Sequence, residues 1–302
     1  MASLQQIQSR RKAVKNVGQI TKAMEVVAAT KMRKSQQVAL DSRPYAYKAL
    51  ELLDRMLQYA PLKSDLVTAR EIKKILVVIM TSDRGLIGSF NTQVLREADS
   101  AIGTGGSSYV ITVGRKATAY ANKRGLNIVK SYEGFGEYVL PEQVAPLTDF
   151  IIEGYKEEQW DRVIILSTHF RTTLKQDVIK RDILPLDLDR VRETVKDVIP
   201  EHGRYSELSG PTVQVDEEKD LYIFEPSPGE ALDALLPHLV RMELYDVVLE
   251  ANASEHSARM VAMKTASDNA SELTETLTLE FNKIRQANIT REIIEITSAQ
   301  SA

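Results

Sequence analysis

Residues 266–284, ASDNASELTETLTLEFNKI, carry an apolar or small side chain at every third or fourth position. These side chains fall on one stripe of a helix: Ala266, Ala270, Leu273, Leu277, Phe281 and Ile284. The stretch lies within 65 residues, His238 to Ala302, that contain neither glycine nor proline. A helix of that length measures about 98 Å, whereas a compact chain of this size has a radius of gyration of about 19 Å. The sequence therefore predicts a long helix that extends beyond any compact domain.

The N-terminal segment, from about Ser3 to Leu57, has the same character. Only Gly18 and Pro44 interrupt it, and Pro44 is expected to kink or re-cap the helix. Its apolar stripe comprises Leu4, Ile7, Val14, Val17, Ile20, Met24, Val27 and Met32. Two such stripes cover each other most simply in an antiparallel coiled coil. The second helix, 230–302, would be longer by roughly 27 Å. Its tip is therefore expected to need an external partner for Ile289, Ile293, Ile294 and Ile296.

The middle of the chain holds 21 of the 24 glycines and prolines and reads as a globular domain. Predicted strands alternate there with predicted helices. The strands are Ile75–Met80, Tyr109–Val113, Asn127–Val129 and Val163–Ser167, and the helices are Asn91–Ala101, Arg115–Lys123 and Pro141–Glu158. This rhythm predicts a small, mostly parallel sheet with helices on its faces, and Thr172–Leu186 could add an edge strand. Residues 187–220 read as an exposed irregular insertion.

Signals of chemistry are few. The turn after the first strand, residues 82–91 (SDRGLIGSFN), lacks the G-x-G-x-x-G pattern, and the chain has no P-loop sequence. A tight turn with Asn91 as helix N-cap is the better interpretation. The four histidines show no metal-ligand spacing. The absence of cysteine excludes disulfides, thiolate catalysis and Cys-ligated zinc. We expect no catalytic residue, no cofactor and no metal site.

Charge is unevenly distributed along the chain. The formal net charge is −3, yet residues 1–50 carry +8 and the remainder −11. The basic residues of this first segment are Arg10, Arg11, Lys12, Lys15, Lys22, Lys31, Arg33, Lys34, Arg43 and Lys48. A basic helix suits a protein socket lined with carboxylates and equally suits a nucleic-acid backbone. With no apolar run of 18 residues and no signal-peptide core after Met1, a soluble cytoplasmic protein is expected.

Residues 19–34, QITKAMEVVAATKMRK, closely resemble the N-terminal helix of the gamma subunit of F-type ATP synthases. Three further stretches resemble that family in the same order: 81–86 (TSDRGL), 257–264 (SARMVAMK) with Asp268-Asn269, and 282–292 (NKIRQANITRE). The resemblance covers nearly the whole chain. Two departures stand out: Ala299-Gln300 replaces the family's usual Gly-Ala, and the paired-cysteine insertion of light-regulated members is absent.

The resemblance implies a fold and a function. The fold would be an antiparallel coiled coil of the N- and C-terminal helices, 1–57 and 230–302, around a small Rossmann-like α/β foot domain, 58–229. The chain would be the rotor shaft that couples ion-driven rotation of the c ring to conformational cycling of three alpha and three beta subunits. Its partners would be that alpha-beta ring, the epsilon subunit and the c ring, with no nucleic acid and only indirect membrane contact through the Fo sector. The place implied is the cytoplasmic face of a bacterial membrane, in a non-catalytic subunit of a rotary ATP synthase.

The resemblance also implies contact residues. Those toward alpha and beta would be Met24, Lys31, Arg33, Arg259, Arg285, Gln286, Thr290 and Glu292, and Glu225 in 222–226 (YIFEP) would lie on the c-ring side. Two other hypotheses stay open from the residues. One is an architectural nucleic-acid binder, resting on the +8 segment, and the other is a Rossmann-like nucleotide-binding enzyme.

Overall fold

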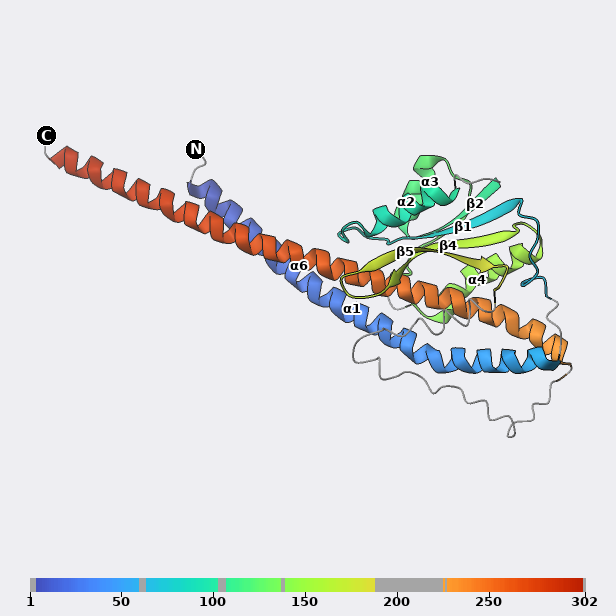
Figure 1. Cartoon of the computed structure of the whole chain (residues 1–302). Helices are drawn as coiled ribbons and strands as arrows, with labels where there is room; N and C mark the ends of the chain where they lie inside the picture. Colours follow the sequence, from blue (N-terminus) through green and yellow to red (C-terminus); the bar gives the residue numbers. More distant parts are fainter. Residues whose placement is uncertain are drawn as a thin grey trace. The chain divides into compact units, whose positions relative to one another are not determined.

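The computed structural model describes residues 4–59, 64–102, 107–136, 139–187, 225 and 227–300. The chain divides into two compact units. Residues 30–258 form the sheet unit, and residues 1–29 with 259–302 form the coil unit. Two long helices contribute to both units: α1, Leu4–Tyr59, and α6, Pro228–Gln300 (Figure 1). These helices and the α/β domain between them confirm the predicted fold class.

The prolines inside the long helices do not end them. Pro44 lies within α1 and Pro237 within α6, so the re-capping considered for Pro44 does not occur. The domain limits expected near residues 57 and 229 lie close to the end of α1, at Tyr59, and the start of α6, at Pro228. The sheet unit is larger than the expected middle domain, because it includes residues 30–258. The insertion expected at 187–220 lies, from residue 188 onward, outside the described residues.

The sheet has five strands in the order β3-β2-β1-β4-β5. Their bounds are β1 Lys74–Met80, β2 Ser107–Val113, β3 Ile128–Tyr132, β4 Arg162–Phe170 and β5 Gln176–Leu184. The first four pair in parallel, and β5 joins β4 antiparallel at the edge. The predicted parallel sheet and its added edge strand are thus both confirmed.

Helices cover both faces of the sheet, which explains why β1 reads, after Lys74, as the unbroken apolar run ILVVIM at 75–80. On one face, Val77 and Ile79 pack under α2, Phe90–Ile102, and α3, Arg115–Arg124. On the other face, Leu76 and Val78 belong to a larger core beneath α4, Pro141–Lys156 (Figure 1).

The larger core also includes the inner ends of both long helices. Leu53 of α1 and Leu239 of α6 are completely buried in it. Trp160 is buried there as well, and its Nε1 donates a hydrogen bond to the Ile151 carbonyl at 3.1 Å. Since each fully buried large side chain stabilises the fold by about 1.5–3 kcal/mol, this core ties α1 and α6 firmly to the sheet.

Candidate partner-binding surface

The seam between the two helices of the coil unit follows a strict seven-residue repeat. Its buried positions include Ile7, Thr21 and Ala28 on α1 and Met263, Ala270 and Leu277 on α6, and half-buried Val14 and Ile284 continue the same seven-residue spacing. A seven-residue period keeps the same side chains facing the partner when two helices wind around each other with a left-handed supercoil. The coil unit is therefore a two-stranded coiled coil.

Two contacts give the antiparallel register of the coil. The Arg11 guanidinium carbon lies 4.9 Å from the centre of the Phe281 ring, a cation–π contact. Seven residues further along α1, Gly18 faces Ala270, and a Cβ built on Gly18 would be 3.2 Å from the Ala270 Cβ. Glycine at this position lets the two backbones approach closely.

A second apolar row on α1 points away from the seam. Val17, Ile20 and Val27 are 53%, 59% and 55% exposed, so the prediction that they pack in the coiled coil is wrong. The seven-residue seam passes instead through Gly18 and Thr21, which a search for large apolar residues skips. On α6, Leu273 and Leu279 are exposed as well. The coil unit thus has apolar side chains on its outer surface.

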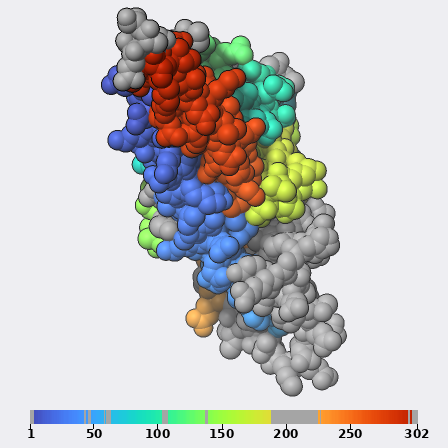
Figure 2. All heavy atoms as spheres, turned by 90° about the vertical axis from the view of Figure 1, so that its left-hand side faces the viewer, coloured from blue at the N-terminus to red at the C-terminus, as the bar shows by residue number. Residues whose placement is uncertain are grey.

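A groove with a volume of about 950 Å³ runs between the two helices of the coil unit. One wall carries basic side chains of α1, including Arg11, Lys15 and Lys22, and the other carries Asp268 and Glu275 of α6. The surfaces of the two helices lie side by side in Figure 2, α1 in dark blue and α6 in red. Carboxylates on one wall would repel a phosphate backbone, so this groove suits a protein of mixed charge better than a nucleic acid.

The end of α6 extends past the start of α1. The pairing of Arg11 with Phe281 places Leu4 near residue 288, so the last dozen residues of α6 continue for about 18 Å past the first described residue of α1. Every side chain from 285 to 294 is exposed. Four isoleucines of this free end are 47–61% exposed: Ile289, Ile293, Ile294 and Ile296. Among the described residues, no helix covers these isoleucines, as the sequence predicts.

The predicted contact residues fall into four groups. Arg285, Gln286, Thr290 and Glu292 lie together on the exposed end of α6, where Thr290 Oγ1 donates to the Gln286 carbonyl at 2.9 Å. Met24 and Arg259 are half-buried in the coil unit. Lys31, half-buried, and Arg33, exposed, belong to the sheet unit. Glu225 is exposed, and the residues beside it lie outside the described ranges. Their contacts with other subunits stay predictions.

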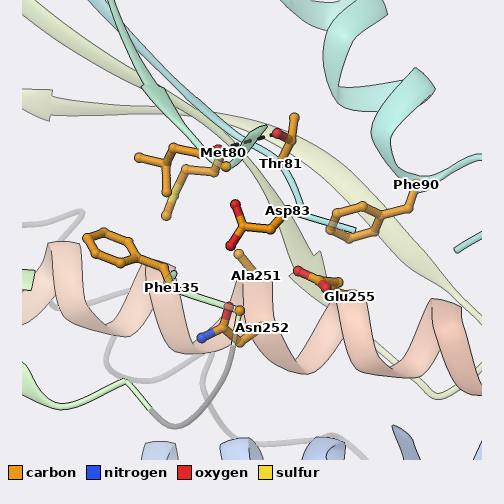
Figure 3. Close-up of a pocket in the computed structure, with 11 residues that line it drawn as sticks. Met80, Thr81, Asp83, Phe90, Phe135, Ala251, Asn252 and Glu255 are labelled. Atoms are coloured by element: carbon orange, nitrogen blue, oxygen red, sulfur yellow. Dashed lines mark hydrogen bonds between the residues drawn. The ribbon is translucent and has the colours of Figure 1, made fainter. Parts of the chain in front are cut away.

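A second candidate region lies at the carboxyl ends of β1 and β2, where a doubly wound sheet binds its ligand. There α6 fills the crevice with Ala251, Asn252 and Glu255, which face Asp83 across a hollow of only about 20 Å³ (Figure 3). Such a volume holds about one water molecule, whereas ligand pockets measure about 300–1,000 Å³. This hollow therefore cannot receive a nucleotide, and its carboxylates would repel phosphate.

Asp83 has a structural task that sequence reasoning missed. One carboxylate oxygen accepts the backbone N–H of Arg115 at 3.0 Å, and the other accepts that of Gly134 at 2.9 Å. Arg115 is the first residue of α3, so the carboxylate satisfies a donor at the start of that helix. Asp83 thus joins three separate turns at one edge of the sheet.

Asn91 does not cap α2 as predicted, because the helix begins one residue earlier, at Phe90. Its side chain reaches back to Ser82 instead. Asn91 Oδ1 accepts the Ser82 backbone N–H at 3.1 Å, and Asn91 Nδ2 donates to Ser82 Oγ at 2.9 Å. The amide therefore closes the 82–91 turn from within the helix.

We expect Asp83→Ala to lower the free energy of unfolding by about 1–3 kcal/mol, because two backbone donors lose a charged acceptor. Urea denaturation followed by circular dichroism measures the change. Asp233→Ala, at an exposed position of α6, is the matched control and should change stability by less than about 0.5 kcal/mol. Equal effects of the two substitutions would show that the Asp83 bridge contributes nothing specific.

No cluster of three or more potential metal-ligating side chains occurs among the described residues. His169 contacts Glu250, His238 is exposed, and His256 is buried within α6. His202 lies outside the described residues. In the same described part of the chain, no helix combines the length and apolar character needed to cross a membrane.

Comparison with known proteins gives a consistent family. The family model described as ATP synthase matches residues 3–302. The ATP synthase gamma chain of Geobacter metallireducens is 38% identical over 303 residues, covering 99% of this chain and 98% of that protein. The gamma chain of Pelotomaculum thermopropionicum is 36% identical, covering 100% of this chain and 99% of that protein.

Solved structures share the fold. A chain of the mitochondrial ATP synthase rotor of Euglena gracilis aligns with a TM-score of 0.59 at 19% identity, covering 95% of this chain and 98% of that one. A chain from the OSCP/F1/c-ring structure of the same enzyme aligns with a TM-score of 0.63 at 19% identity, covering 99% and 94%. At this level of identity the structures support the fold.

Proposed function

Because this chain belongs to the family of ATP synthase gamma chains, which form the central stalk of F-type ATP synthases, we propose that its coil unit is a rotor shaft. In this proposal the shaft turns inside a ring of three alpha and three beta subunits. Its rotation couples ion flow to ATP synthesis or hydrolysis in that ring.

The observation that carries this proposal is the exposed apolar surface of the coil unit. Isolated exposed apolar residues are ordinary, but here they form a row on α1 and a cluster on the free end of α6. A helix end with four exposed isoleucines is best stabilised inside another protein. The mixed charge of the groove walls also suits protein loops.

The coil can act on its surroundings because its faces differ. One face carries Val17 and Ile20, another carries the basic and acidic groove walls, and the free end belongs to α6 alone. Against a ring of three similar sites, such a rod makes different contacts with each site at any angle. A partner changes the populations of two conformations only by binding them unequally, and rotation of an asymmetric rod supplies that difference.

We propose the same roles for the predicted contact residues. Arg285, Gln286, Thr290 and Glu292 of the free end would meet alpha and beta subunits, together with Met24, Lys31, Arg33 and Arg259. The sheet unit would form the foot that meets the epsilon subunit and the c ring, with Glu225 on the c-ring side. The complex would then hold this chain peripherally at the cytoplasmic face of a bacterial membrane.

We also propose that this subunit is non-catalytic. The crevice where a Rossmann-like sheet would bind a nucleotide is filled by α6, which leaves the nucleotide-binding alternative without support. The nucleic-acid alternative loses its main argument because Asp268 and Glu275 face the basic side of the groove. Nucleotide chemistry would then belong to the subunits around the shaft.

Reconstitution with alpha and beta subunits, and then with the membrane sector, tests the proposal. We expect the full chain to co-purify with alpha and beta as one complex. A chain that ends at Ala287 keeps the seam through Ile284 but lacks the free apolar end. It should still assemble, but ATP-driven ion pumping should be lowered several-fold. Each lost isoleucine would otherwise contribute about 1.5–3 kcal/mol of binding free energy on burial in a partner.

The control is Glu280→Gln, an exposed change on α6 that leaves the free end intact. Ion pumping should stay near the value for the full chain. Failure of the full chain to assemble with alpha and beta would overturn the rotor proposal. Assembly with unchanged pumping after truncation would overturn only the role of the free end.

A further inference from the structure

Within the sheet unit, α6 carries a buried stripe of polar residues. Glu243, Asp246, Glu250, Ser254 and Ser257 recur at three- and four-residue steps and are at most 8% exposed. A buried polar stripe is unusual in a helix, because each polar group loses its hydration and needs a partner inside the protein. The partners of these side chains therefore show which part of the sheet unit holds α6.

Three of these residues contact the hairpin formed by β4 and β5. Ser254 Oγ donates to the Thr168 carbonyl at 3.4 Å, and Ser257 Oγ donates to the Thr173 carbonyl at 2.7 Å. Glu250 meets the side chains of both strands. The hairpin thus holds this part of α6 through hydrogen bonds and charges, in contrast to the apolar core beneath α4.

One carboxylate oxygen of Glu250 is shared by two cationic groups. His169 Nδ1 of β4 lies 3.2 Å from Glu250 Oε2, and Arg181 Nη2 of β5 lies 3.7 Å from the same oxygen. The three side chains are only 21%, 9% and 12% exposed, in the order His169, Glu250 and Arg181. Within the described part of the chain, Arg181 Nη1 is buried without a hydrogen-bond partner. His169 and Arg181 therefore both depend on the Glu250 carboxylate.

Two other carboxylates of these elements have partners other than His169. Asp177 stands opposite His169 in the β4–β5 ladder, but its carboxylate binds Arg171 Nε at 2.7 Å. Asp246, one turn before Glu250 on α6, receives the Ser42 hydroxyl of α1 at 3.4 Å. Glu250 is therefore the carboxylate that responds directly to the proton on His169.

We propose that His169, Glu250 and Arg181 form a pH-sensitive clamp through which the β4–β5 hairpin holds helix α6. Protonated His169 donates to Glu250 and closes the clamp. When His169 loses its positive charge, its contact with Glu250 becomes at most a neutral hydrogen bond, donated by the tautomer that keeps the proton on Nδ1. The ion pair with His169 is then gone, Glu250 keeps only its longer ion pair with Arg181, and the hold on α6 weakens. The clamp lies wholly inside the sheet unit, so it does not depend on the rotor proposal.

The hydrogen bond to Glu250 raises the pKa of His169 above its ordinary value, against desolvation and against the charges of Arg181 and Arg171. A raised histidine pKa in the folded state means that protonation stabilises the fold. That contribution is complete below the ordinary histidine pKa and is lost as pH rises through the raised value. The clamp should therefore be closed in mildly acidic solution and open in alkaline solution.

Hydrogen exchange of the full chain, measured at several pH values and corrected for the intrinsic rate, tests the clamp. We expect protection of the α6 amides 247–257 to fall about three- to tenfold between pH 5.5 and 8.5, as expected for loss of a charge-assisted hydrogen bond. His169→Gln should remove this dependence. His238→Gln, at an exposed histidine of the same helix, should leave it unchanged.

Two further variants should move the His169 titration, followed by NMR, in opposite directions. Glu250→Gln should lower the pKa of His169, because the carboxylate is gone. Arg181→Gln should raise it, because a competing cation is gone. Protection that does not vary with pH in the unaltered chain would overturn the proposal. So would an unchanged His169 titration in both folded variants.

Discussion

Replacing Gly114 by alanine is expected to lower the free energy of unfolding of the sheet unit by about 3 kcal/mol or more. Gly114 follows β2 and precedes α3, with φ at +92°, a conformation that L side chains rarely adopt. A Cβ at this position would lie 2.1 Å from the Thr81 carbonyl oxygen. Since that oxygen belongs to the backbone after β1, the clash cannot be relieved by a rotamer change.

Gly134→Ala is the matched control for Gly114→Ala. Gly134 has a similar φ of +85°, but nothing lies within 4 Å of its would-be Cβ. Gly134→Ala should therefore lower the free energy of unfolding only by the cost of the conformational strain, about 1–2 kcal/mol. Urea denaturation of both variants gives the difference, which reports the clash with Thr81. Similar losses of unfolding free energy for the two glycines would mean that the backbone segments after β1 and β2, at Thr81 and Gly114, move apart at little cost.

The helices and strands of this fold could be predicted from local sequence patterns, which do not depend on tertiary contacts. The alternation of short apolar runs with helical stretches predicts the parallel sheet. β1 is apolar from Ile75 to Met80 because α2, α3 and α4 cover both of its faces. The long helices follow from the scarcity of glycine and proline in both terminal segments. The free end of α6 follows from length alone, since the second helix is longer than the first.

The seam of the coil could not be predicted in the same way. Val17, Ile20 and Val27 form a better apolar stripe than Gly18 and Thr21, yet the smaller residues face α6. Close approach of two helices needs small side chains at the contact, whereas apolarity alone does not say which protein covers a stripe. A seven-residue spacing, sought separately from size, would have found the seam.

The candidate sites were only partly within reach of the sequence. Asp83 lies in a recognisable turn, but its partners Arg115 and Gly134 are distant in sequence and become visible only once β1, β2 and β3 are paired. For the polar stripe on α6, the sequence alone is misleading. Its glutamates and serines read as a solvated helix face, and only the fold shows that a hairpin buries them.

Gly154→Ala is the second substitution with a large expected effect. Gly154 lies in α4, and a Cβ there would be 2.1 Å from Trp160 Cζ2. The Trp160 ring is held by its hydrogen bond to Ile151 and by Phe150, whose ring centre is 5.6 Å away. Overpacking should lower the free energy of unfolding by about 3 kcal/mol, and alanine's better helix propensity offsets only about 1 kcal/mol.

A double-mutant cycle separates this clash from a general effect on α4. Trp160→Leu alone should be destabilising, because it removes a buried ring and the hydrogen bond that Trp160 Nε1 donates to the Ile151 carbonyl. In the background of Trp160→Leu, however, Gly154→Ala should cost little, because the ring that meets the new Cβ is gone. Urea denaturation of the four proteins should give a coupling energy of about 1–3 kcal/mol. Additive losses would show that glycine is needed at position 154 for a reason other than the Trp160 ring.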